Sequence, residues 1–413
     1  MVWWIDNFES SYCRQKFCYY EESMDSSKDR IFQTTSIMYN LDDGCYDAHD
    51  IKILTKSGVN IFNVDRIIYG EDVFQKHKAA IIASEKLHEM YPERHHRPIG
   101  LAVIMTITEL IDIDNRVDLI ILKDVESLEG LLEFKKHYRN KKTAPIVPWI
   151  KTKNTIELNQ IIKFSDGIVV DDSNTVEENC CKINLCKQYF KPVFYIIEGL
   201  IQGYRASPAD ERKIFAVANK IVKNDLDGVL LLDNYKEVRE DVQTGVVKSL
   251  VLAIDVVEKT SNKDKHSYKL TLQLKIPMLP PKSVALAACL AAKQSGASAI
   301  IVFTSSGSSA RLVASGAPPC HILAITTRKE TARRLHLYRK VIPLFYNLSE
   351  SNSLNWHQER WKRIQFCTTV ALQIGICHYE ANIVILAPSS EEVGYCNSLQ
   401  IISMPLKCEE LTF

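Results

Sequence analysis

Short apolar runs alternate with amphipathic stretches along the first part of the chain. Eight runs have the length and composition of buried strands, and most are separated by stretches whose apolar residues recur at helical spacing, such as 71–90, 127–138 and 209–223. The eight runs cover residues 36–40, 59–64, 99–105, 118–122, 145–150, 167–170, 192–197 and 228–232. Eight strand–helix units over roughly 200 residues predict an α/β fold, a (β/α)8 TIM barrel, whose catalytic groups lie at the carboxyl ends of its strands.

A second series of α/β elements follows the barrel. The pattern predicts a helix at 238–259 that closes the barrel, and the charged run 259–266 is typical of a linker or turn. Beyond it we expect helices at 283–294, 309–315, 329–338 and 356–377, and strands at 299–303, 321–326, 383–387 and 399–404. The predicted segments are an N-terminal arm at 1–33, a TIM-barrel domain at 34–243 and a C-terminal α/β domain at 244–413.

The first predicted strand of the second domain ends in a turn of small polar residues. This turn, 304–309, has the sequence TSSGSS, and a predicted helix follows at once. The turn offers backbone N–H groups and hydroxyls, and the helix N-terminus adds partial positive charge, so the arrangement suits a phosphate group. The alternative is an ordinary N-cap, in which a Ser or Thr side chain satisfies the N–H groups of the helix start.

Composition limits the classes of function. Charged residues make up 24% of the chain and hydrophobic ones 46%, and the net charge of +1 gives no reason to expect nucleic acid or an anionic membrane as a partner. No apolar run is long enough to span a membrane, and the N-terminus lacks the basic region of a secretory signal. The 12 cysteines form no repeated CxxC pair, so we expect no zinc site, reduced thiols and a cytoplasmic location.

The second domain resembles the C-terminal domain of the pyruvate kinase family. The likeness rests on SGASAIIVFTSSGSSARLVA at 295–314, on HILAITTRKETARRLHLYRKVIPLFY at 321–346, and on the spacing from Trp356 to Arg363. A weaker likeness continues through the barrel at 54–60, 97–102, 165–170, 191–193 and 217–219. The resemblance implies a TIM barrel followed by a C-terminal α/β domain. The family's inserted β-barrel lid domain is expected to be absent, because the chain leaves no room for it after Met105.

The resemblance also implies an activity, which is phosphoryl transfer between phosphoenolpyruvate and ADP by an enzyme that uses Mg²⁺ and K⁺. The family's active-site motifs, however, are not matched. The Lys-x-Glu motif of the fifth strand falls at Pro148 and Ile150 without a gap, or at Trp149 and Lys151 with one gap. The metal-binding Asp of the sixth strand falls at Asn174, a weaker ligand for Mg²⁺.

The remaining motif positions are substituted as well. The phosphate-binding Arg falls at Asn63, with Arg66 the nearest cation, and the other motifs fall at 104–107, 196–198 and 232–235. We therefore expect no catalytic residue, no metal ligand and no cofactor. One alternative is a different chemistry at the barrel mouth, carried by a cluster of charged side chains. The other is that the same side chains are solvated loop charges without a catalytic role. These side chains are Lys151, Lys153, Asp171, Asp172 and Glu198.

At the effector site of the family the residue types are largely retained. The resemblance implies that Thr304, Ser305, Ser306 and Ser309 hold one phosphate of fructose 1,6-bisphosphate, and that Trp356 and Arg363 reach the other. The family's third element, a Gly-rich basic loop, is replaced by a segment with Glu391 and Glu392, which would repel a bisphosphate. We expect weak binding of a monophosphate or inorganic phosphate. The alternative is that Trp356 packs in the interdomain core and Arg363 forms a local salt bridge.

Three hypotheses about function follow. The first is a pseudoenzyme that binds partners, either pyruvate kinase subunits or copies of itself, since the family is typically a homotetramer. The second is an active pyruvate kinase, and the third is a sugar-phosphate sensor without catalysis. None of the three requires nucleic acid or a membrane.

Overall fold

The computed structural model describes twelve segments of the chain. They are residues 34–44, 46–89, 98–108, 116–138, 144–151, 155–171, 175–202, 204–205, 207–232, 239–260, 277–347 and 355–404. The predicted N-terminal arm lies outside the described residues, and everything below refers to the described ones.

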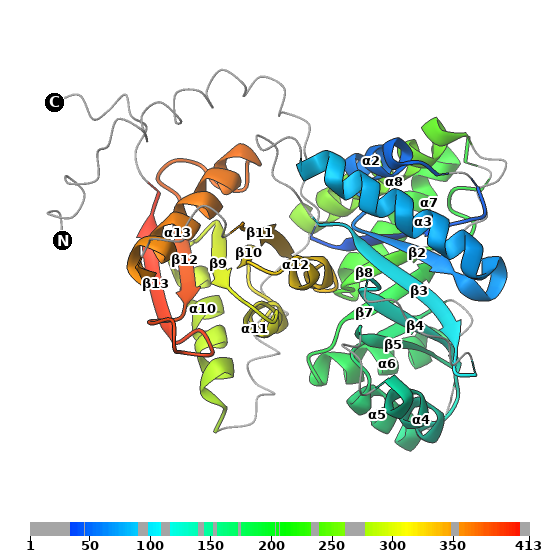
Figure 1. Ribbon diagram of the computed structural model, residues 1–413, viewed down its shortest axis with the longest axis horizontal. Helices are drawn as coiled ribbons and strands as arrows, with labels where there is room; N and C mark the ends of the chain where they lie inside the picture. Colours follow the sequence, from blue (N-terminus) through cyan, green and yellow to red (C-terminus); the bar gives the residue numbers. More distant parts are fainter. Residues whose placement is uncertain are drawn as a thin grey trace, which may run out of the picture.

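Eight parallel strands close into a barrel, which confirms the predicted fold class (Figure 1). The strands are β1 (Ser36–Leu41), β2 (Ile61–Asp65), β3 (Gly100–Thr106), β4 (Leu119–Val125), β5 (Ile146–Ile150), β6 (Ile168–Val170), β7 (Val193–Ile197) and β8 (Gly228–Leu231). They pair in sequence order, and β1 closes the barrel by pairing with β8. The register between β4 and β5 shifts between Leu122 and Val125.

Side chains alternate between the barrel interior and the surrounding helices, as the two-residue period of a strand requires. On β5, for example, Val147 and Trp149 belong to the interior cluster, whereas Ile146 and Ile150 pack in the outer cluster beneath the helices. The helices are α2 (Ala48–Ser57), α3 (Arg66–Glu89), α4 (Leu128–Tyr138), α5 (Thr155–Phe164), α6 (Val176–Gln188), α7 (Pro208–Lys223) and α8 (Glu240–Thr260).

The helix α8 packs against α7 and α2, so it is part of the barrel's outer layer. The boundary that we predicted at residue 243 therefore falls inside a barrel helix, and we propose a boundary after Thr260 instead. The connection from β3 to β4 is short, because β3 ends at Thr106 and β4 begins at Leu119. No inserted domain fits between these two strands.

The C-terminal domain has a five-stranded sheet with the order β11-β10-β9-β12-β13, in which only β13 is antiparallel to its neighbour. Its strands are β9 (Ala299–Phe303), β10 (His321–Thr326), β11 (Val341–Phe345), β12 (Asn382–Ala387) and β13 (Ser398–Ser403). Its helices are α10 (Pro280–Ser295), α11 (Ser308–Ser315), α12 (Lys329–Leu335) and α13 (Trp356–Gln373). In Figure 1 this domain lies beside the barrel, and α12 is its helix nearest to the barrel strands.

The pattern analysis missed the strand β11. Its central residue is Pro343, which cannot donate a backbone hydrogen bond and reads as a strand breaker in the sequence. The structure tolerates it because β11 is an edge strand that pairs only with β10.

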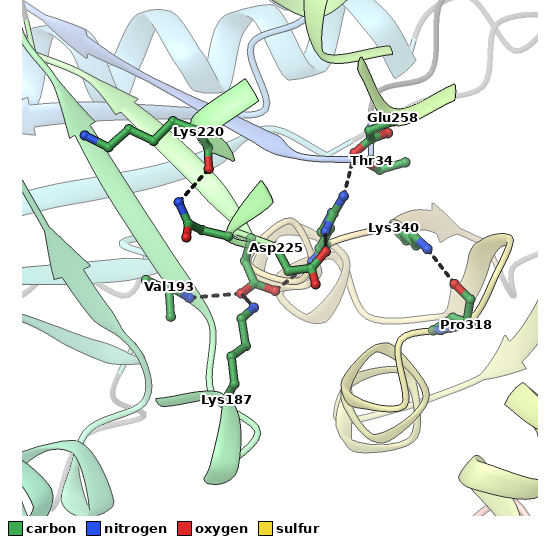
Figure 2. Close-up of polar contacts among 11 residues, drawn as sticks. Thr34, Lys187, Val193, Lys220, Asp225, Glu258, Pro318 and Lys340 are labelled. Atoms are coloured by element: carbon green, nitrogen blue, oxygen red, sulfur yellow. Dashed lines mark hydrogen bonds and ion pairs between the residues drawn. The ribbon is translucent and has the colours of Figure 1, made fainter. Parts of the chain in front are cut away.

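Polar contacts join the two domains at the amino end of the barrel. Arg339, in the turn after α12, forms ion pairs with Asp225 and with Glu258 of the barrel. Figure 2 shows Asp225, Glu258 and Thr34 on the barrel side of this contact and Lys340 on the other side. Leu337, from the same turn, packs into the interior cluster of the barrel. The C-terminal domain therefore closes this end of the barrel, and the other end is the mouth where catalytic groups of such folds lie.

Candidate functional site

The turn 304–309 lies at a switch point of the C-terminal sheet. The chain leaves β9 through α11 to β10 on one side, and it later returns through α13 to β12 on the other side of β9. Ligands of open α/β sheets bind outside the carboxyl ends of the strands at such a reversal of strand order. The topology therefore gives the turn a favourable position for a ligand, independently of its residue types.

The turn is held in shape from within. Gly307 is the N-cap residue of α11 and has a φ of 86°, a left-handed conformation that favours glycine. Its N–H donates to Thr304 Oγ1 at 2.9 Å, and the exposed hydroxyls of Ser306 and Ser308 lie 3.1 Å apart. Gly307 has no side chain with which to cap α11, but Ser308 N, at the first helical residue, donates to Ser306 Oγ at 3.5 Å. Hydroxyls of the turn therefore accept from N–H groups at the helix start, as the N-cap alternative requires.

Two further contacts fix the turn, from residues that the sequence analysis missed. Thr331 Oγ1 on α12 donates to Ser305 O at 2.8 Å, and Cys396 Sγ, before β13, donates to Phe303 O at 3.0 Å. Cys396 also forms a hydrogen bond with Ser309, and burial raises the pKa of its thiol to about 11. No short-range sequence signal marks Thr331 or Cys396, because both reach the turn through the tertiary fold.

The helix α13 brings Arg363 to the same edge of the sheet. The Arg363 Cζ lies 6.0 Å from the centroid of the Phe303 ring, and Phe303 directly precedes the turn. The same atom lies 5.6 Å from the Tyr346 centroid. Arg363 Nε donates to Glu359 Oε1 at 2.9 Å, so the local salt bridge that we considered as an alternative is present. The structure thus places Arg363 beside the turn but already paired with a carboxylate.

Trp356 is the first residue of α13 and is half-buried, with no hydrogen-bond partner for its indole Nε1. Arg360, one turn further along the helix, donates from Nη2 to Gln400 Oε1 at 3.0 Å, and its Nε is buried without a partner. Trp356, Glu359, Arg360 and Arg363 share one helix face, since they are separated by three, four and seven residues. Their spacing from Trp356 could have predicted from the sequence that Glu359 and Arg360 lie on the same helix face as Arg363.

The loop between β12 and β13 carries Glu391 and Glu392, and both side chains are exposed. Within this loop Ser389 N donates to Asn397 Oδ1 at 2.7 Å, and Asn397 Nδ2 donates to Ser389 Oγ at 2.9 Å. Water and salt largely screen exposed charges, so these two carboxylates repel a bound anion less strongly than buried carboxylates would.

At the barrel mouth, β5 presents Trp149, followed by Lys151. Ile150 packs in the outer cluster, so the ungapped placement of Lys-x-Glu at Pro148 and Ile150 does not face the mouth. Trp149 Nε1 donates to Asp171 Oδ2 at 2.7 Å, and the Lys123 Nζ lies 5.4 Å from the centroid of the Trp149 ring. Lys151 pairs with Asp124 at 2.7 Å, and this hydrogen bond raises the pKa of Lys151.

The other described motif positions are structural. Asn63 is fully buried and donates to Asn40 Oδ1 at 2.6 Å. Arg66 is buried, forms an ion pair with Glu71 and lies 5.1 Å from the Phe74 centroid. Ile104 fills the barrel interior, Ile197 packs in the outer cluster, and Glu198 is exposed. Lys153, Asp172, Asn174 and the segment 233–235 lie outside the described residues.

The described residues do not fit a divalent-metal site. Across the segments that the structure covers, no three His, Cys, Asp or Glu side chains are grouped so that they could hold a metal ion. Asp171 accepts from Trp149, and Asp124 is paired with Lys151, so these two carboxylates at the mouth already have partners, whereas Glu198 is exposed. Among the described helices, none has both the length and the apolar character of a membrane span.

Comparison with known proteins supports the family that the sequence suggested. Residues 282–402 match the family model described as pyruvate kinase, alpha/beta domain. Pyruvate kinase 1 of Trypanosoma brucei brucei is 26% identical over 302 residues, which are 70% of this chain and 59% of that protein. The pyruvate kinase of Candida albicans is 23% identical over 303 residues, with the same two coverages of 70% and 59%.

A higher identity is confined to the second domain. Pyruvate kinase 1 of Candida glabrata is 36% identical over 125 residues, which are 30% of this chain and 25% of that protein. The chain spans about three fifths of the length of the relatives that it matches across both domains, 59% in each case. Together, the closed eight-stranded barrel, the matching C-terminal domain and these relatives support membership of the chain in the pyruvate kinase family, at low identity.

Proposed function

We propose that this chain is a catalytically impaired pyruvate-kinase-like protein that acts as a binding or regulatory subunit in the cytoplasm. The observation that carries the proposal is the fifth barrel strand. Its carboxyl end offers Trp149 and Lys151 to the mouth, and Lys151 is bound to Asp124. No carboxylate stands at the described position from which the family holds its metal.

Phosphoryl transfer depends on positioning and on neutralising the charge of the moving group. The described mouth lacks a group of metal ligands, and Arg66 is buried in contacts of its own. The short β3–β4 connection also removes the lid that would exclude water from the reaction. The barrel core is intact, which supports a role for the fold as a scaffold, with copies of itself or pyruvate kinase subunits as partners.

An activity assay tests the proposal. The full chain is assayed with phosphoenolpyruvate, ADP, Mg²⁺ and K⁺, beside the Trypanosoma brucei brucei relative as a positive control. We expect turnover more than about a thousandfold below a typical kcat of about 10 s⁻¹. Turnover within that factor contradicts the proposal and favours the alternative of an active pyruvate kinase. Native mass spectrometry of the chain mixed with active pyruvate kinase subunits tests the subunit role.

A second candidate function is the binding of a phosphate group at the turn 304–309. It is favoured by the position of the turn at the switch point and by Arg363 beside Phe303. A thermal-shift titration with inorganic phosphate and with fructose 1,6-bisphosphate tests it, since a ligand at a hundred times its Kd stabilises the folded state by about 2.7 kcal/mol. Absence of any shift at millimolar concentrations contradicts this role.

A further inference from the structure

Glu359 is a buried carboxylate that pairs with Arg363, beside the candidate phosphate site. It lies on α13, its residue surface is only 7% exposed, and its Oε1 accepts from Arg363 Nε at 2.9 Å. Arg363 also lies against the ring of Phe303, the residue that directly precedes the turn 304–309. Arg363 therefore contacts both Glu359 and the residue that directly precedes the turn.

The second carboxylate oxygen of Glu359, Oε2, is buried and has no hydrogen-bond partner. Leaving a buried acceptor unsatisfied costs free energy, so a group that donates a hydrogen bond to Oε2 is stabilised there. On the same helix face, Trp356 Nε1 and Arg360 Nε are buried donors without partners. A ligand that pairs with all three of these atoms therefore needs oxygen acceptors for the two N–H groups and at least one hydrogen-bond donor for Glu359 Oε2.

Phosphate and sulfate differ in this respect. Hydrogen phosphate and dihydrogen phosphate keep a P–OH group at neutral pH and can donate to a carboxylate. Sulfate is fully ionised and has acceptors only. Beside an unpaired carboxylate oxygen, sulfate meets repulsion and leaves Oε2 unsatisfied, whereas a protonated phosphate donates to it.

We propose that Glu359 is the specificity-determining residue of this site, and that it selects a protonated phosphate group over a fully ionised anion. This inference rests on the proposed phosphate-binding role of the turn. Glu359 has a second effect, because it neutralises the Arg363 cation and so weakens the site for a second phosphate. The site then takes inorganic phosphate in preference to a bisphosphate, because phosphate ester groups have lost most of their P–OH protons at neutral pH.

The test is isothermal titration of the full chain with inorganic phosphate and with sulfate near pH 7. We expect the wild-type chain to prefer phosphate by on the order of tenfold, the value of about one hydrogen bond. In Glu359→Gln the side-chain amide can donate as well as accept, so the preference falls to within about twofold. The matched control is the double variant Glu391→Gln/Glu392→Gln, which should keep the wild-type preference.

Ser306→Ala, which removes an exposed hydroxyl of the turn, locates the site by weakening phosphate binding. Equal wild-type affinities for phosphate and sulfate overturn the inference without any variant, even if Glu359→Gln fails to fold. An unchanged preference in folded Glu359→Gln overturns it too, while the phosphate-binding role survives both results. Absence of binding by either anion overturns the phosphate-binding role itself, and the inference falls with it.

Discussion

At the scale of single residues, burial controls the chemistry of the thiols that the structure describes. Cys181 is exposed, whereas Cys289, Cys367 and Cys396 are buried. Burial raises the pKa of Cys396 to about 11 and that of Cys289 to about 12. Because the thiolate is the reactive form, these buried thiols are protonated across the physiological pH range and are poor nucleophiles.

We therefore predict selective alkylation. Iodoacetamide at pH 7.5 should modify Cys181 within minutes and leave Cys396 largely unmodified, because a thiol of pKa about 11 is roughly 0.03% ionised at that pH. Peptide mass spectrometry over a time course measures both rates, and a sample unfolded in urea is the control in which both react. Equal rates in the folded protein contradict the packing of Cys396 against Phe303.

At the residue scale, the likeness to the family located the turn 304–309 and Arg363, and their binding of phosphate stays a prediction. The turn 304–309 and Arg363 are brought to the same edge of the sheet, as the likeness implied. The sequence could not decide which residues of β5 occupy the positions of the Lys-x-Glu motif. Ile150 and Trp149 point to opposite faces of the strand, and a single gap in the comparison determines which of them faces the mouth. The sequence analysis also overlooked Glu359, because an acidic residue in a helix usually indicates a solvated face.

At the scale of elements, α13 presents the candidate residues from its amino-terminal turns. The helix begins with a capping box, in which Asn355 accepts from Gln358 N at 3.0 Å and Gln358 Oε1 accepts from Asn355 N at 3.3 Å. This cap fixes the start of the helix and hence the direction of the face that carries Trp356 and Glu359.

Replacing Asn355 by Ala should destabilise this start by about 1 kcal/mol, the usual cost of a lost N-cap. Hydrogen exchange of the first turn of α13 should become faster, while exchange in the barrel strands stays unchanged. Asn355→Asp, which keeps an oxygen acceptor, is the matched control and should behave like the wild type. Unchanged exchange in Asn355→Ala would show that packing alone holds the helix start.

Most elements were predictable from pattern because each buries one face and exposes the other. The strand β7, predicted at 192–197, is Val193–Ile197, and β9 coincides with its predicted range of 299–303. The helix α12 ends at Leu335, before the predicted residue 338, because the turn that follows inserts Leu337 into the barrel cluster. Here a tertiary contact overrides local helix propensity.

At the scale of the whole molecule, a buried ion-pair network joins the two domains. Arg333 on α12 donates from Nε to Asp118 Oδ1 at 2.9 Å, and Asp118 Oδ2 also accepts from Arg116 Nη1 at 2.5 Å. Close by, His336 Nε2 lies 2.8 Å from Pro98 O. Since Thr331 on the same helix bonds to the turn, α12 touches both the candidate phosphate site and the barrel.

Removing one partner from a buried ion pair leaves an uncompensated charge. Asp118 is only 3% exposed, so Arg333→Ala should lower the free energy of unfolding by about 3 kcal/mol, the lower end of the usual range because Arg116 still neutralises part of the charge. Urea unfolding followed by far-UV circular dichroism measures this loss as a lower midpoint.

The matched control is Arg328→Ala, which removes the same side chain from the exposed N-cap position of α12 and should change stability by less than about 0.5 kcal/mol. The tryptophan fluorescence of each domain is a further readout. Trp149 reports on the barrel, and Trp356 and Trp361 report on the C-terminal domain. If the network couples the domains, the wild type unfolds in one transition by all probes, and Arg333→Ala splits it. Equal stability of the two variants means that the buried pair contributes no net stability, and that apolar contacts such as that of Leu337 hold the domains together.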